Sequence, residues 1–280
     1  MEYVTLHNGV RMPQLGFGVY QTPPEETQRC VSDALEIGYR HIDTAQAYNN
    51  EEGVGAAVKT SGIDRQDIFL TSKVWFYKEG YTAARASIDE SLKRLDTDYI
   101  DLMLVHQPFG DYYSTYRALE EAYEAGKLRA IGVSNFYPDR LVDLCEFTHI
   151  TPMVNQVETH VFFQQQEARP FMDQLGIIHE SWGPFAEGIN DFFTNPTLSG
   201  IAEKYGKTVA QVALRYLIER GVVVIPKSTH KERMAENFNV FDFQLSDADK
   251  ETIALLDTHH SVFLDHRTGE TAQRFAGFAR

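Results

Sequence analysis

The stretch GYRHIDTAQAY, residues 38–48, begins as a short apolar strand and ends in polar residues before two asparagines. This pattern predicts a strand with Asp43 at its carboxyl end and Tyr48 one loop step beyond it. An acid and a phenol in that position can support catalysis, although a lone aspartate at a strand end is more often structural. The way in which the later strands end therefore decides between the two interpretations.

Short apolar strands and amphipathic helices alternate along the chain. The polar strand ends recur about every 30 residues, the length of one strand-helix unit, and eight such units close a (β/α)8 barrel. We also predict an N-terminal β-hairpin at residues 3–13 and extra helices before and after strand 8, including 196–205 and 208–219. Because no linker interrupts the pattern, we expect one domain, residues 1–280. The eight predicted strands are 15–17, 41–43, 68–75, 100–106, 128–133, 153–156, 177–181 and 222–225.

The composition is that of an ordinary globular protein, with 43% hydrophobic and 24% charged residues. A formal net charge of −14 argues against binding to nucleic acids or anionic membranes, because like charges repel. Cys30 and Cys145 lack metal-ligand spacing, so we interpret them as reduced thiols. We expect a cytoplasmic protein without a signal peptide or a membrane segment, since no apolar run approaches about 18 residues.

Polar or charged side chains end seven of the eight predicted strands. The carboxyl ends of barrel strands build the active site, so these residues are the first candidates for function. Any one of them can merely hydrate a loop, but chance would scatter apolar residues and glycines among seven such positions. The residues are Asp43, Lys73, His106, Ser134, Gln156, Ser181 and Lys227.

Four side chains form a candidate site for protonating an oxygen. A lysine at the end of a buried strand needs a partner, and Asp43 on the adjacent strand is the nearest one for Lys73. We expect the Lys73 ammonium to lower the pKa of the Tyr48 phenol by roughly 1–3 units, towards the range of an efficient acid. His106 can donate a hydrogen bond to the same substrate oxygen.

The chain offers no obvious nucleophile and no metal site for attack on the carbon. It contains no Gly-x-Ser-x-Gly turn, no His-Glu-x-x-His motif, and no paired catalytic cysteine and histidine. We therefore expect the missing reagent to be a bound cofactor. Gly16 and Gly18 match the first two glycines of the dinucleotide-binding motif Gly-x-Gly-x-x-Gly. Gln21 occupies the position of the third glycine, so we reject a Rossmann site.

The remaining strand ends favour a nicotinamide dinucleotide as that cofactor. Ser134, Asn135 and Gln156 are suited to recognising a carboxamide, and the Trp182 indole can stack on a flat ring. These four residues follow three consecutive predicted strands, so they should meet at one side of the barrel mouth.

A phosphate site is predicted in the turn after the last strand. Thr229 and Glu232 have the spacing of a capping box, which indicates that a helix begins there. Lys227, Ser228 and Arg233 surround this helix start, and helix N-termini favour anions. A solvated helix start is the plain alternative, but the neighbouring carboxamide pocket favours a dinucleotide.

Taken in order, these motifs resemble the aldo-keto reductase family. The resemblance implies a barrel enzyme that binds NADPH and reduces carbonyls with the tetrad Asp43, Tyr48, Lys73 and His106. By the same resemblance, Glu236 and Asn237 contact the adenine of NADPH, and SWGP at 181–184 is similar to the small bacterial 2,5-diketo-D-gluconate reductases. The other matching stretches are GYRHIDTA at 38–45, TSKVW at 71–75, LVHQP at 104–108, GVSNF at 132–136, NQVE at 155–158 and IPKS at 225–228.

The expected substrate is a small carbonyl compound bound among aromatic side chains. Tyr20, Trp75 and Phe109, together with His106, are the candidate substrate-binding residues. Gln107 replaces a tryptophan that is common in the family, which changes one wall of the pocket. The tail at 259–280 is short, which predicts a more open pocket than in long-tailed mammalian members, and its segment DHR at 265–267 has no assigned role.

Two other classes of protein remain possible. A regulatory or redox-sensing protein can hold NADPH on the same barrel with little turnover, and a barrel hydrolase can use paired carboxylates. The first predicts a partner surface, whereas the second needs two acids at strand ends and finds Asp43 paired with a lysine. The leading hypothesis is an NADPH-dependent carbonyl reductase that binds no metal and is a monomer or weak dimer.

Overall fold

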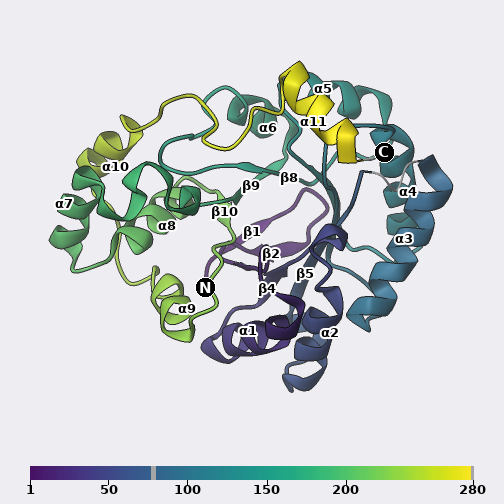
Figure 1. The fold of residues 1–280 in the computed structure, drawn as a ribbon, viewed down its shortest axis with the longest axis horizontal. Helices are drawn as coiled ribbons and strands as arrows, with labels where there is room; N and C mark the ends of the chain where they lie inside the picture. The colour runs from purple at the N-terminus through teal and green to yellow at the C-terminus, as the bar shows by residue number, and fades with distance from the viewer. Residues whose placement is uncertain (77–79, 279–280) are drawn as a thin grey trace.

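The computed structural model describes residues 1–76 and 80–278. An eight-stranded parallel sheet forms its centre, and helices surround it (Figure 1). The strands follow one another in chain order, each paired in parallel with the next. They are β3 (Phe17–Gly18), β4 (His41–Asp43), β5 (Phe69–Val74), β6 (Leu102–Val105), β7 (Ile131–Ser134), β8 (Val154–Glu158), β9 (Ile178–Trp182) and β10 (Val223–Val224).

The first and last strands meet and close the sheet. Leu15 forms a parallel bridge with Val224, and the Gly16 N–H donates to the Val224 carbonyl at 2.8 Å. Gly16 and Gly18 stand at this junction because a Cβ on either would come within 2.9 Å of Ile225 atoms. These glycines therefore serve close strand approach, and the prediction of a (β/α)8 barrel is confirmed.

Helices cover the outer face of the barrel, so the strands are buried on both sides. The helix after each strand carries apolar residues at helical spacing on its inner face, as Cys30, Val31 and Ala34 do in the first one. The helices are α1 (Pro24–Ile37), α2 (Glu51–Thr60), α3 (Gly80–Leu95), α4 (Tyr112–Glu124), α5 (Pro138–Phe147), α6 (Arg169–Leu175), α7 (Pro196–Tyr205), α8 (Val209–Glu219), α9 (Lys231–Phe238), α10 (Asp247–Ala254) and α11 (Gly269–Phe278), with 3-10 turns η1 (Gln46–Tyr48), η2 (Arg65–Asp67) and η3 (Ala186–Thr194).

The extra helices around strand 8 are confirmed, but one predicted helix cap is wrong. Thr208 caps α8 in a reciprocal capping box with Gln211. The predicted box of Thr229 and Glu232 does not form, because α9 begins one residue later than that box requires, with His230 as its N-cap, and the His230 side chain makes no cap bond. The Ser228 hydroxyl instead accepts the His230 N–H at 3.1 Å, and this bond keeps residues 228–230 out of the helix.

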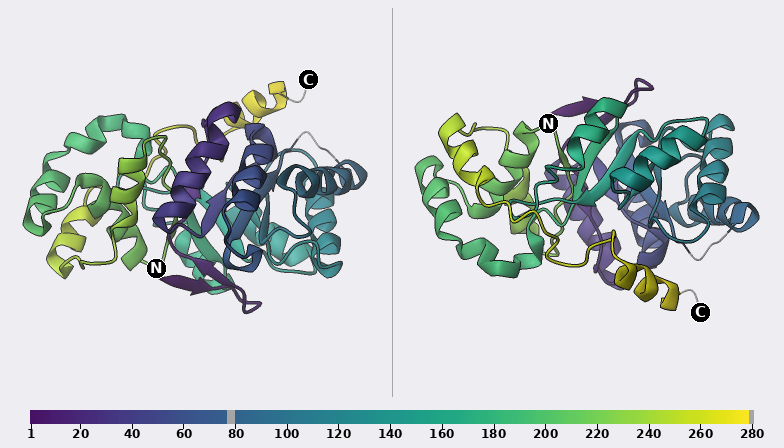
Figure 2. Two further views of the ribbon diagram at one scale, coloured as in Figure 1. Left: turned by 90° about the horizontal axis from the view of Figure 1, so that it is seen from below. Right: turned by 90° about the horizontal axis from the view of Figure 1, so that it is seen from above.

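The N-terminal hairpin and the C-terminal helix α11 lie at opposite poles of the barrel (Figure 2). The predicted hairpin forms from β1 (Tyr3–Thr5) and β2 (Arg11–Pro13), paired antiparallel with Tyr3 opposite Pro13. A groove of about 720 Å³ lies beneath it, lined by residues at the amino-terminal ends of strands, such as Arg40 and Asp101. No helix in the described ranges is long and apolar enough to cross a membrane.

The C-terminal tail lies over the other pole, where the strands have their carboxyl ends. Its helix α11 packs on the barrel through Phe275. The Phe275 ring centroid is 4.9 Å from that of Phe109 and 5.7 Å from that of Phe76. These rings form an apolar cluster separate from the main core. The last two residues of the tail, 279–280, lie outside the described residues. The tail therefore packs on the face that carries the candidate site.

Candidate active site

The Asp43 and Lys73 side chains form a buried ion pair at the carboxyl end of the barrel. Lys73 Nζ donates to Asp43 Oδ1 at 2.6 Å and to the Thr44 carbonyl at 2.9 Å. Lys73 is 0% exposed and Asp43 is 2% exposed. Burial disfavours the ammonium, but Asp43 and Tyr48 outweigh it and raise the pKa of Lys73 above its usual value. The predicted pairing is confirmed, and the lysine remains a cation at neutral pH.

Tyr48 lies on η1, a short turn that is tied to the end of β5. The Gln46 Oε1 atom accepts the Trp75 backbone N–H at 3.2 Å, and Asn49 ends the turn with a left-handed φ of 55°. The Tyr48 ring then faces the lysine, with its centroid 5.1 Å from Lys73 Nζ. The polar run at 43–48 therefore brings the phenol to the ion pair.

The predicted direction of the Tyr48 pKa shift is wrong. Burial raises the pKa of Tyr48 to about 12, and the opposing effect of the Lys73 charge only reduces this rise. The nearby cation favours the ionised phenol, but ionising a phenol away from water costs more free energy than the cation recovers. At neutral pH the phenol is therefore fully protonated, which is the state that a proton donor requires.

Aromatic rings surround the phenol on the open side of the barrel. The ring centroids of Tyr20 and Tyr48 are 5.0 Å apart, and His106 meets Tyr48 edge-on at 5.6 Å. Trp75 meets His106 edge-on at 4.9 Å. Burial and the Lys73 charge lower the pKa of His106 well below its usual value, so its ring is neutral. Three of the predicted substrate residues thus lie around the phenol.

Phe109 makes its ring contacts with the tail. Its ring stacks on Phe275 at 4.9 Å and on His266 at 6.1 Å. The nearby Gln107 Oε1 lies 3.1 Å from His266 Nε2, within hydrogen-bond distance. The unassigned segment DHR at 265–267 therefore contacts the residues that follow β6, and the place of Phe109 in a substrate pocket stays a prediction.

The four residues predicted to bind a nicotinamide lie together and bond one another. Ser134 Oγ donates to the Gln156 carbonyl at 2.8 Å, and Trp182 Nε1 donates to Asn135 Oδ1 at 2.8 Å. Gln156 Nε2 donates to Asp43 Oδ2 at 2.9 Å, so it also fixes the carboxylate of the ion pair. That second contact was not predicted, because it joins strands that are far apart in sequence and meet only across the barrel.

The predicted phosphate site lies at the turn between β10 and α9. Lys227 and Arg233 are exposed, whereas Ser228 and Asn237 are buried. In residues 1–76 and 80–278, no carboxylate forms an ion pair with Lys227 or Arg233. Glu236 is held beside α8, because its Oε1 accepts a bond from the N-cap hydroxyl of that helix at 2.9 Å. In the described part of the chain, Lys227 in the turn and Arg233 in the first turn of α9 are thus exposed cations without a carboxylate partner.

Glu180 is a buried group that the sequence reasoning did not identify. It lies in the middle of β9, is 0% exposed, and has its Oε1 3.7 Å from His41 Nε2. Burial and the nearby Asp43 raise the pKa of Glu180 to about 8, and burial lowers the pKa of His41 to about 3. Both groups are thus neutral near pH 7. A glutamate inside the predicted strand 177–181 was the signal that could have found it.

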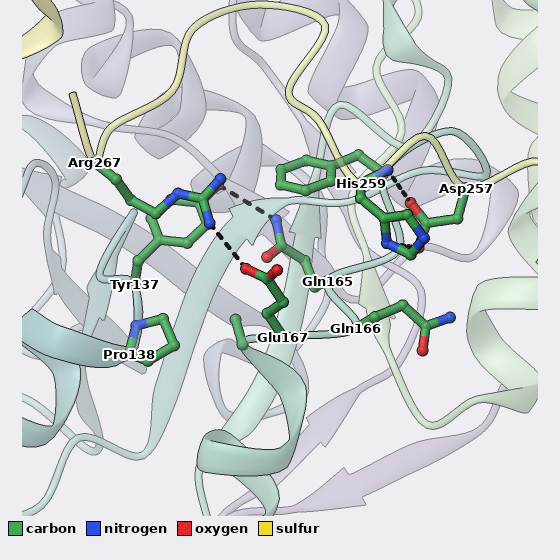
Figure 3. A pocket seen from close by; sticks show the side chains of 10 residues that line it. Tyr137, Pro138, Gln165, Gln166, Glu167, Asp257, His259 and Arg267 are labelled. Carbon is green, nitrogen blue, oxygen red and sulfur yellow. Dashed lines mark hydrogen bonds and ion pairs between the residues drawn. The ribbon is translucent and has the colours of Figure 1, made fainter.

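A small cavity beside the tail is too small for an organic ligand (Figure 3). It offers about 10 Å³ to the centre of a water-sized sphere, enough for one water molecule. Arg267 spans it by bonding Glu167 at 3.0 Å and lying over the Tyr137 ring. Within the described part of the chain, no group of three or more His, Cys, Asp or Glu residues is arranged to hold a metal ion.

The chain is similar to proteins of one family along most of its length. A model described as "Aldo/keto reductase family" matches residues 13–258. The glyoxal reductase of Bacillus subtilis is 47% identical over 261 residues, which cover 92% of this chain and 94% of that protein. A crystal structure of an aldo-keto reductase from a Medee basin deep-sea metagenome library is 44% identical, with a TM-score of 0.93 and coverage of 95% and 98%. The Bombyx mori aldo-keto reductase in complex with NADP is 34% identical, with a TM-score of 0.88 and coverage of 94% and 95%.

Proposed function

The chain belongs to the aldo/keto reductase family, and from that premise we propose that it reduces aldehydes or ketones to alcohols with NADPH. The observation that carries this proposal is the buried Asp43–Lys73 pair against the ring of the protonated Tyr48. Burying two charges costs desolvation free energy, and apolar side chains could fill the same space without that cost. The proximity of the pair to a phenol gives it a chemical use.

In this proposal Tyr48 gives its proton to the substrate oxygen. Bound NADPH supplies a hydride to the carbonyl carbon. The Lys73 cation then stabilises the phenolate that remains, because an opposite charge favours the ionised form. Asp43 holds the cation in place, and Gln156 holds Asp43 through the 2.9 Å bond. The neutral His106 ring donates a hydrogen bond that orients the carbonyl.

The side chains at the barrel mouth have the chemical groups that NADPH binding needs, and the ones that would contact its ring and its phosphate are accessible to solvent. Trp182 is partly exposed, so its indole can take a flat ring, and Asn135 and Gln156 carry amide groups for a carboxamide. The exposed Lys227 and Arg233 provide free positive charge for a 2′-phosphate on a protein of net charge −14. Ser228, Glu236 and Asn237 complete the predicted adenosine end.

We propose a small aldehyde or α-dicarbonyl as the substrate. The basis is the B. subtilis relative, a glyoxal reductase that is 47% identical over nearly its whole length. Tyr20 and Trp75 beside the phenol provide aromatic walls for such a compound. Specificity among carbonyl compounds depends on these walls and on the neighbouring tail.

The test is to follow NADPH absorbance while the protein is offered glyoxal, other α-dicarbonyls, simple aldehydes and keto sugars. We expect turnover of about 1 s⁻¹ or more with the best compound, as is usual for enzymes. NADPH binding without turnover of any carbonyl in the panel would contradict a reductase and favour a redox-sensing protein.

A further inference from the structure

The tail segment at residues 261–266 crosses the barrel mouth and is anchored at its first end by a buried carboxylate. Glu158, at the end of β8, is 0% exposed. Its Oε2 accepts the Ser261 hydroxyl at 2.5 Å and its Oε1 accepts the Val262 N–H at 2.9 Å. His160 Nε2 lies 3.0 Å from the same Oε1. A buried carboxylate with several partners fixes where the segment begins to cross.

His266 anchors the other end of this segment. It is 4% exposed and lies between the rings of Phe109 and Tyr137, with centroid distances of 6.1 and 6.4 Å. Burial lowers the pKa of His266 to about 4, so its ring is neutral at neutral pH. Its Nε2 lies 3.1 Å from Gln107 Oε1. This polar contact joins the tail to a residue of the barrel that directly follows His106.

Hydrogen bonds continue from Gln107 to the predicted nicotinamide pocket. Asn135 Nδ2 donates to Gln107 Oε1 at 3.4 Å, a long bond, and to the His106 carbonyl at 3.2 Å. Asn135 Oδ1 accepts the Trp182 indole N–H at 2.8 Å. The chain of contacts thus runs from His266 through Gln107 and Asn135 to Trp182.

The observed contacts fit one assignment of donors and acceptors, in which Asn135 Nδ2 also lies 3.1 Å from Ser134 Oγ. An indole nitrogen can only donate, so Asn135 must present its oxygen to Trp182 and its amide nitrogen to Gln107. Gln107 must then present its oxygen, which can only accept. His266 therefore carries its proton on Nε2 and donates it. Each member of the chain fixes the orientation of the next.

The same tail segment also contacts the Trp182 ring directly. Phe263 packs against the indole, with ring centroids 5.4 Å apart and planes inclined by 44°. The Gly183 position, next to the indole, would place a Cβ 3.6 Å from the Phe263 ring. Two contacts from one tail segment therefore converge on the residue predicted to stack on the nicotinamide.

We propose that His266 is a positioning residue for the nicotinamide pocket, and that it acts through Gln107 and Asn135 on Trp182. The proposal rests on the proposed function, because it assigns NADPH to that pocket. It implies that tail and cofactor are coupled: a tail without the His266 donor leaves Asn135 and Trp182 less ordered. The folded protein then binds NADPH more weakly while Tyr48 and Lys73 are unchanged.

The first test compares two variants of His266 with a control on the same tail. His266→Leu removes the donor, whereas His266→Gln keeps an N–H at a similar reach. His260→Gln alters an exposed histidine six positions earlier. We expect His266→Leu to raise the NADPH dissociation constant about threefold to tenfold, as the loss of one neutral hydrogen bond allows. His266→Gln should recover most of the affinity, and the control should match the wild type.

A readout without cofactor separates positioning from simple stability. In a Trp75→Phe background Trp182 is the only tryptophan, so its emission reports the indole environment. His266→Leu should change that emission in the folded, cofactor-free protein, while His260→Gln should not. If thermal stability falls but Trp182 emission and NADPH affinity stay at wild-type values, His266 only holds the tail and the proposal is overturned.

Combining variants tests the route through Gln107. Because His266 is proposed to act through this side chain, the double variant Gln107→Leu with His266→Leu should lose no more NADPH affinity than Gln107→Leu alone. Additive losses would show a separate route and overturn the proposal. Failure of the proposed function would give a different result: the wild-type protein would bind no NADPH in the same titration.

Discussion

Lys73 and Lys227 both belong to the carboxyl ends of barrel strands, and the structure treats them in opposite ways. Lys73 is 0% exposed and bonds Asp43 at 2.6 Å, whereas Lys227 is exposed and, in the described part of the chain, has no carboxylate partner. A buried ammonium must be paired before any ligand arrives, because leaving it unpaired is too costly. An exposed one can remain free for a ligand. The proposed catalytic end is thus preorganised, and the proposed phosphate end is open.

The largest effect should come from Tyr48→Phe, which removes the proton donor from the preorganised end. Loss of a general acid lowers turnover by roughly 10²–10⁴-fold. NADPH affinity should stay within about twofold, since the hydroxyl loss costs the cofactor at most one weak contact. Steady-state kinetics and NADPH titration measure the two quantities. The exposed Tyr3→Phe variant is the control, and a Tyr48→Phe protein with more than a tenth of wild-type turnover requires a different acid.

Lys73→Met tests whether burial makes the ion pair indispensable. It should inactivate the enzyme and lower the free energy of unfolding by about 3–5 kcal/mol, because Asp43 is left buried without its partner. The matched control is Lys59→Met, which breaks an exposed ion pair with Asp96 and should cost about 1 kcal/mol or less. Urea unfolding of both variants gives the difference. Equal losses of unfolding free energy in Lys73→Met and Lys59→Met would show that burial does not make the Lys73 pair more important for stability.

Arg233→Ala probes the open end. It should weaken NADPH binding about tenfold and leave NADH binding unchanged, since a charge-assisted bond to the 2′-phosphate is lost and solvent screens part of it. Folding stability should hardly change, in contrast to Lys73→Met. Lys231→Ala is the control on the same helix, because that ammonium is already paired with Asp33 and Glu36. Equal losses for NADPH and NADH would assign Arg233 to the fold or the adenine.

The last prediction concerns Glu180 and the dependence of stability on pH. Its folded pKa of about 8 lies above the ordinary value of 4.5, so between these limits the folded chain keeps a proton that the unfolded chain loses. This contribution to stability is complete below pH 4.5 and is lost as pH rises towards 8, by up to about 1.4 kcal/mol per pH unit. Glu180→Gln stays neutral at every pH.

The measurement is urea unfolding of wild type and Glu180→Gln at several pH values from 5 to 8. The variant should become progressively more stable than the wild type as pH rises. Glu52→Gln, on the exposed side of α2, is the control and should track the wild type. A constant difference between Glu180→Gln and wild type would mean that Glu180 is ionised in the folded protein.

Much of the candidate site could be predicted because the (β/α)8 repeat assigns the carboxyl end of each strand to one surface. Asp43 and Lys73 could be paired from sequence, since neighbouring parallel strands bring their ends together. The capping box at Thr229 could not be judged in the same way, because Ser228 captures the His230 N–H and delays the helix. Spacing alone predicted a helix start at Thr229, and a local hydrogen bond moved the start to the next residue.

By itself, the sequence determined which strands and helices form and which polar groups end the strands, because hydrophobic periodicity and chain order control both. Only the tertiary structure decided the environment of those groups. Burial raises the pKa of Tyr48 although Lys73 acts to lower it, and burial together with the nearby Asp43 raises the pKa of Glu180. Gln156 reaches Asp43, and His266 reaches Gln107, across more than 100 residues of chain. Desolvation and contacts at long sequence separation depend on the packed barrel, and no local pattern encodes them.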